Sequence, residues 1–379
     1  MIYDSLNRFA YNLKGIARML TPSFCLPKNR EKILRDLDSR KDLDYIKKRV
    51  DYYCPMSAKI TLDESAKSLD FLRWTHKNTA YFFDCYEYAR YFPQRFKAHF
   101  EFGDVNYIPQ KPSFTKSRPI LDYFIHSSLR GSGNATTKQS TAESSLRENE
   151  RSEFSWQSTK INGGGQNDLN NTDSSLDSPK NPPFANSTLL NMDKIRHFVF
   201  INDTRTFESK QNKLFYRGAI YQAHRTRFFE KYFGNPLCDL GHTGSKSIHQ
   251  AWQKPKIGIA KHLPYKFLLS LEGNDVASNL KWVMSSNSLC VAPKMKFETW
   301  FMEGRLKGGE HFVEIADDYS DLEERLEYFF IHPKDALEII HNAHEYIAQF
   351  RDKKREDIIS LLVLEKYFYY TGQIDSLRI

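Results

Sequence analysis

The clearest structural signal in the sequence is a pair of stretches, Lys213-Leu214-Phe215-Tyr216-Arg217-Gly218 and Phe267-Leu268-Leu269-Ser270-Leu271-Glu272-Gly273-Asn274-Asp275. Each is a short apolar run that ends in polar residues and a glycine, as a buried strand followed by a turn does. Residues 276–286 fit a helix, and residues 288–292 and 311–316 fit two further strands. Strands that alternate with helices predict parallel βαβ units and therefore a doubly wound, Rossmann-like α/β lobe.

Further elements are expected on both sides of this region. Ser320-Asp321-Leu322-Glu323 has the pattern of a capping box that opens a helix, and Pro333 suits the first position of a helix that runs through Phe350. Residues 30–100 have a mostly helical pattern. His99-Phe100-Glu101-Phe102, followed by Gly103-Asp104, predicts a strand that ends in a turn.

Length and composition limit the class of protein. The chain has 379 residues, more than a single core usually serves, so two lobes with a cleft between them are expected. A hydrophobic content of 40% indicates a globular protein. The net charge of +8 suits an anionic ligand, an anionic membrane surface or nucleic acid. Five cysteines without a CxxC pair indicate neither a disulfide framework nor a zinc site, and favour a reducing cytoplasm.

Residues 127–187 differ in composition from the rest of the chain. More than half of them are Ser, Thr, Asn, Gln or Gly. Such a segment buries too little apolar surface to offset the entropy of ordering it. We therefore expect a disordered insertion, and a segment that folds on a partner remains the alternative.

The first twenty residues form an amphipathic pattern. Apolar residues recur at helical spacing, and basic residues lie elsewhere on the wheel. The pattern favours an ordinary packed helix and leaves a basic helix at a membrane surface as the alternative. The apolar positions are Leu6, Phe9, Ala10, Leu13, Ile16, Ala17 and Leu20. No apolar run is long enough to cross a bilayer.

Ligand sites in doubly wound sheets lie beyond the carboxyl ends of the strands. This rule points to Arg217-Gly218 and to the loop 272–279. A helix after that loop would direct free amides at a phosphate, with Arg217 as a bidentate donor and Lys281 as a point charge. Arg217 fits a structural ion pair equally well. The chain has neither GxGxxG nor a P-loop motif, which argues against dinucleotide enzymes and P-loop NTPases.

Taken in order, several segments resemble glycosyltransferase family 90, and in particular its bacterial lipopolysaccharide A branch. The resemblance covers roughly residues 70–125 and 186–350 and rests on the order and spacing of the segments rather than on any single one. The segments are Phe100-Glu101-Phe102-Gly103-Asp104, Lys116-Ser117-Arg118-Pro119-Ile120, residues 186–198, Leu214-Phe215-Tyr216-Arg217-Gly218, residues 266–281, Phe297-Glu298-Thr299-Trp300 and residues 311–322.

The resemblance implies a GT-B architecture of two Rossmann-like lobes. Residues 1–126 and 188–208 would form the acceptor lobe with its linker, residues 209–350 the nucleotide-sugar lobe, and residues 351–379 a C-terminal helix that packs back on the acceptor lobe. It also implies an inverting transfer of a hexose, glucose or galactose, from a UDP-sugar to the inner core of lipopolysaccharide or lipooligosaccharide. No cofactor or divalent metal is expected.

The same resemblance places the enzyme in the cytoplasm, with peripheral contact to the inner membrane and a lipid-linked core oligosaccharide as acceptor. A capsule or O-antigen transferase that uses another nucleotide sugar is the nearest alternative. A basic nucleic-acid-binding protein is more remote, because the aromatic residues lie in apolar stretches rather than among basic ones.

The resemblance also assigns candidate site residues. The donor would be bound by Arg217, Gly218, Gly273, Ser278, Asn279, Lys281 and Glu298. Many relatives have a serine and an arginine where this chain has Ala277 and Asn279, so Lys266, Arg225 or Arg227 would have to supply the missing phosphate contact.

An inverting transfer needs a base opposite the leaving nucleotide. Asp84 is favoured slightly over Asp104 for that role, and either could cap a turn instead. Lys116 and Arg118 are expected on the acceptor side, where phosphates or carboxylates carry negative charge. Simple surface basicity is the alternative for these two residues. Asp317-Asp318 fits a solvated turn better than a metal motif.

Overall fold

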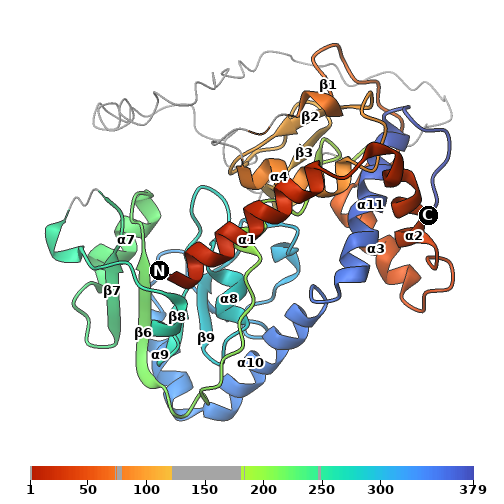
Figure 1. Ribbon diagram of the computed structural model, residues 1–379. Helices are drawn as coiled ribbons and strands as arrows, with labels where there is room; N and C mark the ends of the chain where they lie inside the picture. The colour runs from red at the N-terminus through yellow and green to blue at the C-terminus, as the bar shows by residue number, and fades with distance from the viewer. Residues whose placement is uncertain (1, 73, 75–78, 122–180, 183, 246–248) are drawn as a thin grey trace, which may run out of the picture. The chain divides into compact units, whose positions relative to one another are not determined.

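The computed structural model describes residues 2–72, 74, 79–121, 181–182, 184–245 and 249–379 (Figure 1). Most of the predicted insertion at 127–187 therefore lies outside the described residues, but its predicted C-terminal end is wrong, because Ala185 and Ser187 are buried and Ser187 begins a strand. The described helices are α1 (Ile2–Met19), α2 (Leu26–Leu34), α3 (Leu43–Tyr53), α4 (Thr79–Ala89), α6 (Lys194–His197), α7 (Ala223–Tyr232), α8 (Leu280–Met284), α9 (Leu322–Ile331), α10 (Pro333–Ala348) and α11 (Lys353–Tyr370).

A five-stranded parallel sheet is built from the region in which the sequence predicted βαβ units (Figure 1). Its spatial order is β11-β9-β8-β6-β7. The strands are β6 (Gln211–Gly218), β7 (Cys238–His242), β8 (Tyr265–Leu269), β9 (Leu289–Pro293) and β11 (Val313–Ile315). Apolar side chains fill both faces, as parallel strands require. Leu214 belongs to the hydrophobic cluster that holds α7 and α9, whereas Phe215 belongs to a second cluster.

These elements confirm the predicted α/β class, with two local corrections. The helix expected over 276–286 is shorter, because α8 begins only at Leu280. The capping box is wrong: no side chain caps α9, the Ser320 hydroxyl donates to Asp318 instead, and Asp321 accepts from the amide of Ala316. In both places the local pattern assigned certain side chains to the start of a helix. In the structure these side chains instead make contacts within a turn or with another part of the chain.

A second sheet lies in the N-terminal half of the described chain, in the order β1-β2-β3-β5. Strands β2, β3 and β5 are parallel, and β1 is antiparallel to β2. The strands are β1 (Lys67–Ser68), β2 (Lys97–Glu101), β3 (Ser113–Thr115) and β5 (Ser187–Leu189). A separate antiparallel pair joins β4 (Ser117–Pro119) to β10 (Phe297–Thr299). Residues far apart in the chain are thereby brought together.

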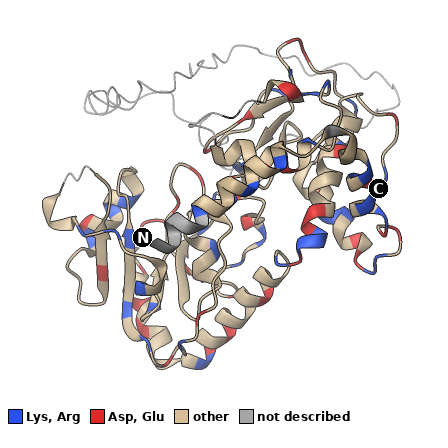
Figure 2. Cartoon of the chain, in the orientation of Figure 1, with Lys and Arg blue, Asp and Glu red and all other residues tan. Residues whose placement is uncertain are grey.

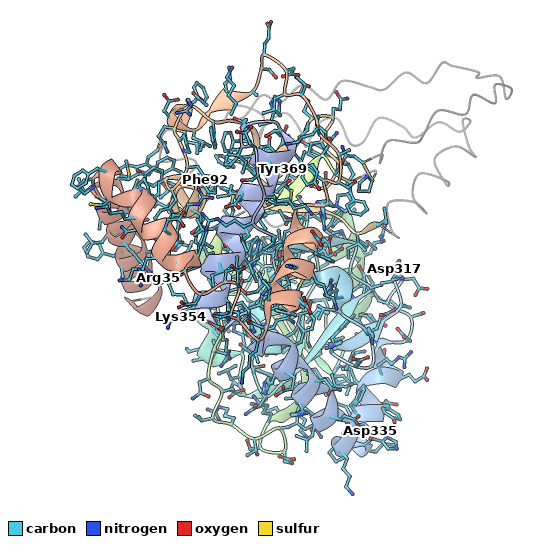
Figure 3. The ribbon with its side chains drawn as sticks, turned by 90° about the vertical axis from the view of Figure 1, so that its right-hand side faces the viewer. Arg35, Phe92, Asp317, Asp335, Lys354 and Tyr369 are labelled. Carbon is cyan, nitrogen blue, oxygen red and sulfur yellow. The ribbon has the colours of Figure 1, made fainter. Side chains whose placement is uncertain are left out.

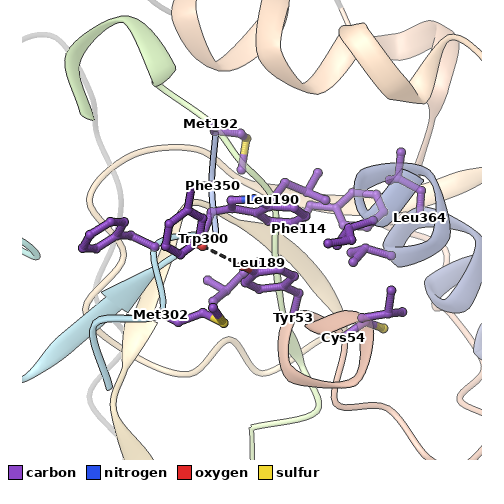
Figure 4. Packing of buried hydrophobic residues seen from close by; sticks show 14 of the residues in the cluster. Tyr53, Cys54, Phe114, Leu189, Leu190, Met192, Trp300, Met302, Phe350 and Leu364 are labelled. Atoms are coloured by element: carbon purple, nitrogen blue, oxygen red, sulfur yellow. Dashed lines mark hydrogen bonds between the residues drawn. The ribbon is translucent and has the colours of Figure 1, made fainter. Parts of the chain in front are cut away.

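The largest hydrophobic cluster contains residues from both halves of the chain (Figure 4). Tyr53 of α3 stacks on Trp300, with 3.8 Å between ring centroids, and its hydroxyl donates to the Trp300 carbonyl oxygen at 2.7 Å. Phe114 of β3 packs against Tyr367 of α11. Helix α11 also contacts α2, α3 and α4. No helix in the described part of the chain is both long and apolar enough to cross a membrane.

Candidate active site

The five-stranded sheet has a switch point at β6. The chain leaves β6 for β7 on one side and later returns to β8 on the other. Loops that follow β6 and β8 therefore diverge at the carboxyl edge, where ligands of such sheets bind. Gly218 ends β6, and the exposed Ser278 and the partly buried Gly273 and Asn279 belong to the loop after β8. The structure thus brings these four predicted residues to one edge.

Arg225 of α7 forms hydrogen bonds to both the loop after β6 and the loop after β8. Its guanidinium donates to the carbonyl oxygens of Leu271 at 2.7 Å, Glu272 at 2.8 Å and Ala219 at 2.9 Å. A Cβ on Gly273 would lie 3.5 Å from this guanidinium. Arg225 therefore supplies a fixed positive charge beside the loop.

Arg217 lies near the end of β6 but turns toward β7. Its guanidinium donates to the Asp239 carboxylate at 2.7 Å and to the Asp239 carbonyl oxygen at 2.9 Å. Gly241 stands opposite Arg217 in the sheet, and a Cβ there would approach the Arg217 side chain to 2.8 Å. The ion pair, which the sequence left open as an alternative, is therefore present. A role for Arg217 on a diphosphate stays a prediction.

A pocket of about 680 Å³ lies where several loops and helix ends meet. Gly103 and Asp104 follow β2, and Asn274 follows β8, so each of the two larger sheets contributes a loop at the carboxyl end of one of its parallel strands. Helices α1, α4 and α6, together with the residue that precedes α6, supply the rest of the lining, which is Arg8, Tyr11, Asn12, Thr79, Ala80, Tyr81, Asp193, Ile195 and Arg196. Asp104 is the predicted site residue that lines this pocket.

A chain of opposite charges runs beneath the pocket. The buried ammonium of Lys116 pairs with Asp104 and, at 2.8 Å, with Asp275. Arg196 contacts Asp104 at 3.4 Å and Asp193 at 2.7 Å. The loop after β2, the loop after β8 and α6 are thus held in one electrostatic network. Lys116 was predicted on the acceptor side, and the structure places it under the pocket rather than on the surface.

The two candidate bases occupy different environments. Burial acts to raise the pKa of Asp104, but Lys116 and Arg196 outweigh it and hold that pKa below its usual value. Its side chain is 28% exposed, at the pocket. The Asp84 side chain is fully buried, and burial raises its pKa to about 6 although Lys194 opposes the shift. Asp84 accepts the backbone N–H of Lys194 at 2.8 Å. At neutral pH Asp104 is a carboxylate in contact with solvent.

Sequence reasoning missed Asp193, Arg196 and Tyr11. Asp193 has a left-handed backbone (φ 57°), which is uncommon for a residue other than glycine and is often found at functional sites. Burial raises its pKa, against the opposing charge of Arg196. Residues 194–198 carried part of the family resemblance. With Asp193 included in the wider segment 186–198, this was a signal for Asp193 and Arg196 but not for Tyr11, and backbone conformation cannot be read from the residue types.

Three other predicted site residues, Lys281, Arg118 and Glu298, are buried in the interior, where they form two ion pairs. Lys281 of α8 forms an ion pair with Glu303, and both side chains have no exposed surface. Arg118 of β4 donates to Glu298 of β10 at 2.7 Å, which joins the two strands. None of these four residues lines the pocket. Lys281 and Glu298 as donor contacts, and Arg118 as an acceptor contact, therefore stay predictions.

Glu272 lies in the loop after β8, and the pKa of its carboxyl is strongly perturbed. It accepts the backbone N–H of Lys296 at 2.8 Å. Burial raises the pKa of Glu272 from 4.5 to about 7, although Lys296 opposes the shift. The native state therefore binds this proton more tightly than the unfolded chain does. The stability that the protonated form contributes is complete below about pH 4.5 and is lost as the pH rises through 7.

We predict that Glu272→Gln stabilises the protein at pH 8 by about 3 kcal/mol. The reason is that each tenfold difference in proton affinity between the folded and unfolded states corresponds to ~1.4 kcal/mol of folding free energy. Glutamine keeps an acceptor for the Lys296 amide and carries no charge to bury. The gain should disappear near pH 4.5. Urea unfolding across this pH range measures it. Glu310→Gln, at an exposed glutamate paired with Lys307, is the control and should show no such gain. A pH-independent difference for Glu272→Gln would contradict the assignment.

The sequence predicts that the protein needs no divalent metal, and this stays a prediction. Within the described residues, no group of three or more His, Cys, Asp and Glu side chains is arranged to hold a metal ion. Asp317, labelled in Figure 3, is 66% exposed and pairs with Lys296 at 3.0 Å.

Comparison with known proteins identifies the class. A model of glycosyl transferase family 90 matches residues 190–367. Over 326 residues the chain is 36% identical to the O-glucosyltransferase LpsA of Dichelobacter nodosus, a match that covers 85% of this chain and 82% of that protein. With the parallel sheets described above, these matches define a glycosyltransferase. The chain belongs to glycosyl transferase family 90, as its motifs indicated.

Proposed function

We propose that this glycosyltransferase transfers a hexose from a UDP-sugar to the inner core of lipopolysaccharide or lipooligosaccharide. The similarity to LpsA over most of both chains is the observation that carries the proposal. The name of that relative, an O-glucosyltransferase, favours glucose over galactose as the sugar. The proposal includes a GT-B arrangement of two lobes and a location at the cytoplasmic face of the inner membrane.

The proposed donor site is the switch point of the five-stranded sheet. Gly273 would let the nucleotide approach the backbone, Ser278 would offer its exposed hydroxyl, and Arg217 and Arg225 would offset the charge of the diphosphate. Gly218 would keep the backbone close to the Tyr216 ring at the same edge. Such fixed cations can stabilise the leaving group without a divalent metal. Arg217 would exchange its partner Asp239 for the diphosphate when UDP binds.

The proposed transfer is an inverting displacement. The acceptor hydroxyl attacks the anomeric carbon, the bond from that carbon to the UDP oxygen breaks, and a carboxylate takes the hydroxyl proton. We assign this base to Asp104, because it is ionised and lines the pocket whereas Asp84 is enclosed. Arg196 and Arg8, at the same pocket, supply positive charge for acceptor phosphates or carboxylates.

UDP should stabilise the protein in the presence of EDTA. At a concentration one hundred times its dissociation constant, a ligand adds about 2.7 kcal/mol to the free energy of unfolding, which raises the thermal midpoint. Arg217→Ala should abolish the shift. Arg325→Ala, which removes an arginine from an exposed pair with Asp321, is the matched control and should keep it. A full UDP shift in Arg217→Ala, or a shift that requires magnesium, would contradict the proposal.

The acceptor is tested in cells. Lipopolysaccharide core from a strain without this protein should be lighter by one hexose, and linkage analysis should locate the missing sugar on the inner core. An unchanged core with an altered capsule or O-antigen would assign the enzyme to another glycan.

A further inference from the structure

Helix α1 and the short 3-10 turn after it (Ser23–Cys25) expose a row of large apolar side chains. Phe9, Leu13, Ile16 and Leu20 recur every third or fourth residue and so share one face of the helix. They are 67%, 56%, 37% and 78% exposed, and Phe24 in the turn is 79% exposed. Single exposed apolar residues are ordinary, whereas a continuous row of them marks an interaction site. The expectation that this apolar stripe packs inside the protein is wrong.

The opposite face of α1 makes the internal contacts. The Tyr11 hydroxyl donates to the Ala80 carbonyl oxygen at 3.1 Å, and Arg18 pairs with Glu87 of α4. Gly15 lies against the Phe83 ring, where a Cβ would come within 2.5 Å. Small and polar residues therefore fix the helix on α4, and this orientation turns the apolar stripe outward.

The charges around the stripe favour one kind of surface. Residues 5–30 contain five basic residues and no Asp or Glu. Arg18 and Arg30 are paired with Glu87 and Glu365, whereas Arg8, Lys14 and Lys28 are exposed. Figure 2 shows the basic positions of α1 in blue. Two copies of this stripe brought face to face would set like charges against each other. An anionic bilayer surface would accept both the apolar side chains and the cations.

We propose that α1 and residues 20–24 bind the surface of an anionic phospholipid bilayer, with the apolar stripe inserted at the interface. The same helix lines the pocket through Arg8, Tyr11 and Asn12. Membrane binding would therefore hold the pocket beside the bilayer, where a lipid-linked acceptor is found. That consequence rests on the proposed function, but the binding itself does not.

The test is flotation of the full-length protein with vesicles. We expect binding to vesicles of phosphatidylglycerol and phosphatidylethanolamine, and binding at least tenfold weaker to phosphatidylcholine alone. Leu13→Asp/Leu20→Asp should weaken binding to the anionic vesicles at least tenfold. Ile331→Asp, at an apolar residue of α9 that is 75% exposed, is the matched control and should bind as the wild type does. Circular dichroism and thermal unfolding verify that both variants are folded.

Equal vesicle binding by the wild type and the folded double variant would overturn the proposal. The proposal would also be overturned if the wild-type protein does not bind vesicles but forms dimers, and the double variant Leu13→Asp/Leu20→Asp is monomeric. The apolar stripe would then be an interface between two copies of the chain. Turnover on a water-soluble core oligosaccharide should be unchanged in the double variant. If vesicle binding follows the predicted pattern but no hexose is transferred, the proposed function is wrong, whereas the proposal that α1 binds an anionic bilayer is supported.

Discussion

Asp104→Asn is expected to lower turnover by a factor of about 10²–10⁴, the usual cost of losing a general base. Asparagine has nearly the same shape but cannot take the proton of the acceptor hydroxyl. The substitution leaves no buried charge unpaired, because Lys116 retains Asp275 at 2.8 Å. The thermal shift by UDP should therefore be preserved. Steady-state rates with UDP-glucose and a core oligosaccharide measure the effect.

Asp84→Asn is the matched control for this prediction. Its amide oxygen can still accept the Lys194 N–H, and removing a carboxyl whose pKa burial raises to about 6 relieves a buried charge at neutral pH. We expect turnover within about tenfold of the wild type, since the Asp84 side chain is fully buried and does not line the pocket. Loss of activity in a folded Asp84→Asn variant, with Asp104→Asn active, would transfer the role of base to Asp84.

Four of the five C-terminal strands were predictable because each contains a short, mostly apolar run between polar turns, whereas β7, with the sequence Cys238-Asp239-Leu240-Gly241-His242, has no such run and was missed. Leu214, Phe267 and Leu289 are all fully buried, as strands covered on both faces must be. The start of α8 was not predictable. Asp275 lies against Lys116 from another part of the chain, and the Asn279 amide donates to the Leu269 carbonyl oxygen at 2.8 Å. These contacts hold the preceding residues in a loop although their local pattern suits a helix.

The site was predictable to the same extent. Asn274 belongs to the loop to which the rule for carboxyl ends pointed, and Asp104 was a candidate base from the family resemblance; both line the pocket. Asp193, which precedes the four-residue helix α6, and Tyr11 of α1 reach the same pocket. Their positions depend on how α1 and α6 pack, and no local pattern encodes that. The amphipathic pattern of the first twenty residues correctly predicted a helix at α1. The apolar face of that helix nevertheless points outward, because a glycine and polar residues make its contact with the rest of the protein.

The largest expected loss of stability comes from Lys281→Met. Both side chains of the Lys281–Glu303 pair are fully buried, so removing the ammonium leaves an uncompensated charge in the interior. Such single removals cost about 3–5 kcal/mol. Glu303 would keep its bonds from the amide and hydroxyl of Thr299, which neutralise no charge. Urea unfolding at neutral pH measures the loss. A decrease below ~1 kcal/mol would mean that the pair is hydrated in solution.

The double variant Lys281→Met/Glu303→Gln separates stability from donor binding at this position. Glutamine retains acceptors for Thr299 and carries no charge, so most of the lost stability should return, because a neutral replacement of a buried pair is often close to neutral in free energy. UDP binding can then be compared in a folded protein. A normal UDP shift would show that Lys281 serves the fold alone, since Arg217 and Arg225 would suffice for the diphosphate. If the double variant regains its stability but not its UDP shift, then Lys281 must leave Glu303 when the donor arrives, and α8 must rearrange in the same step.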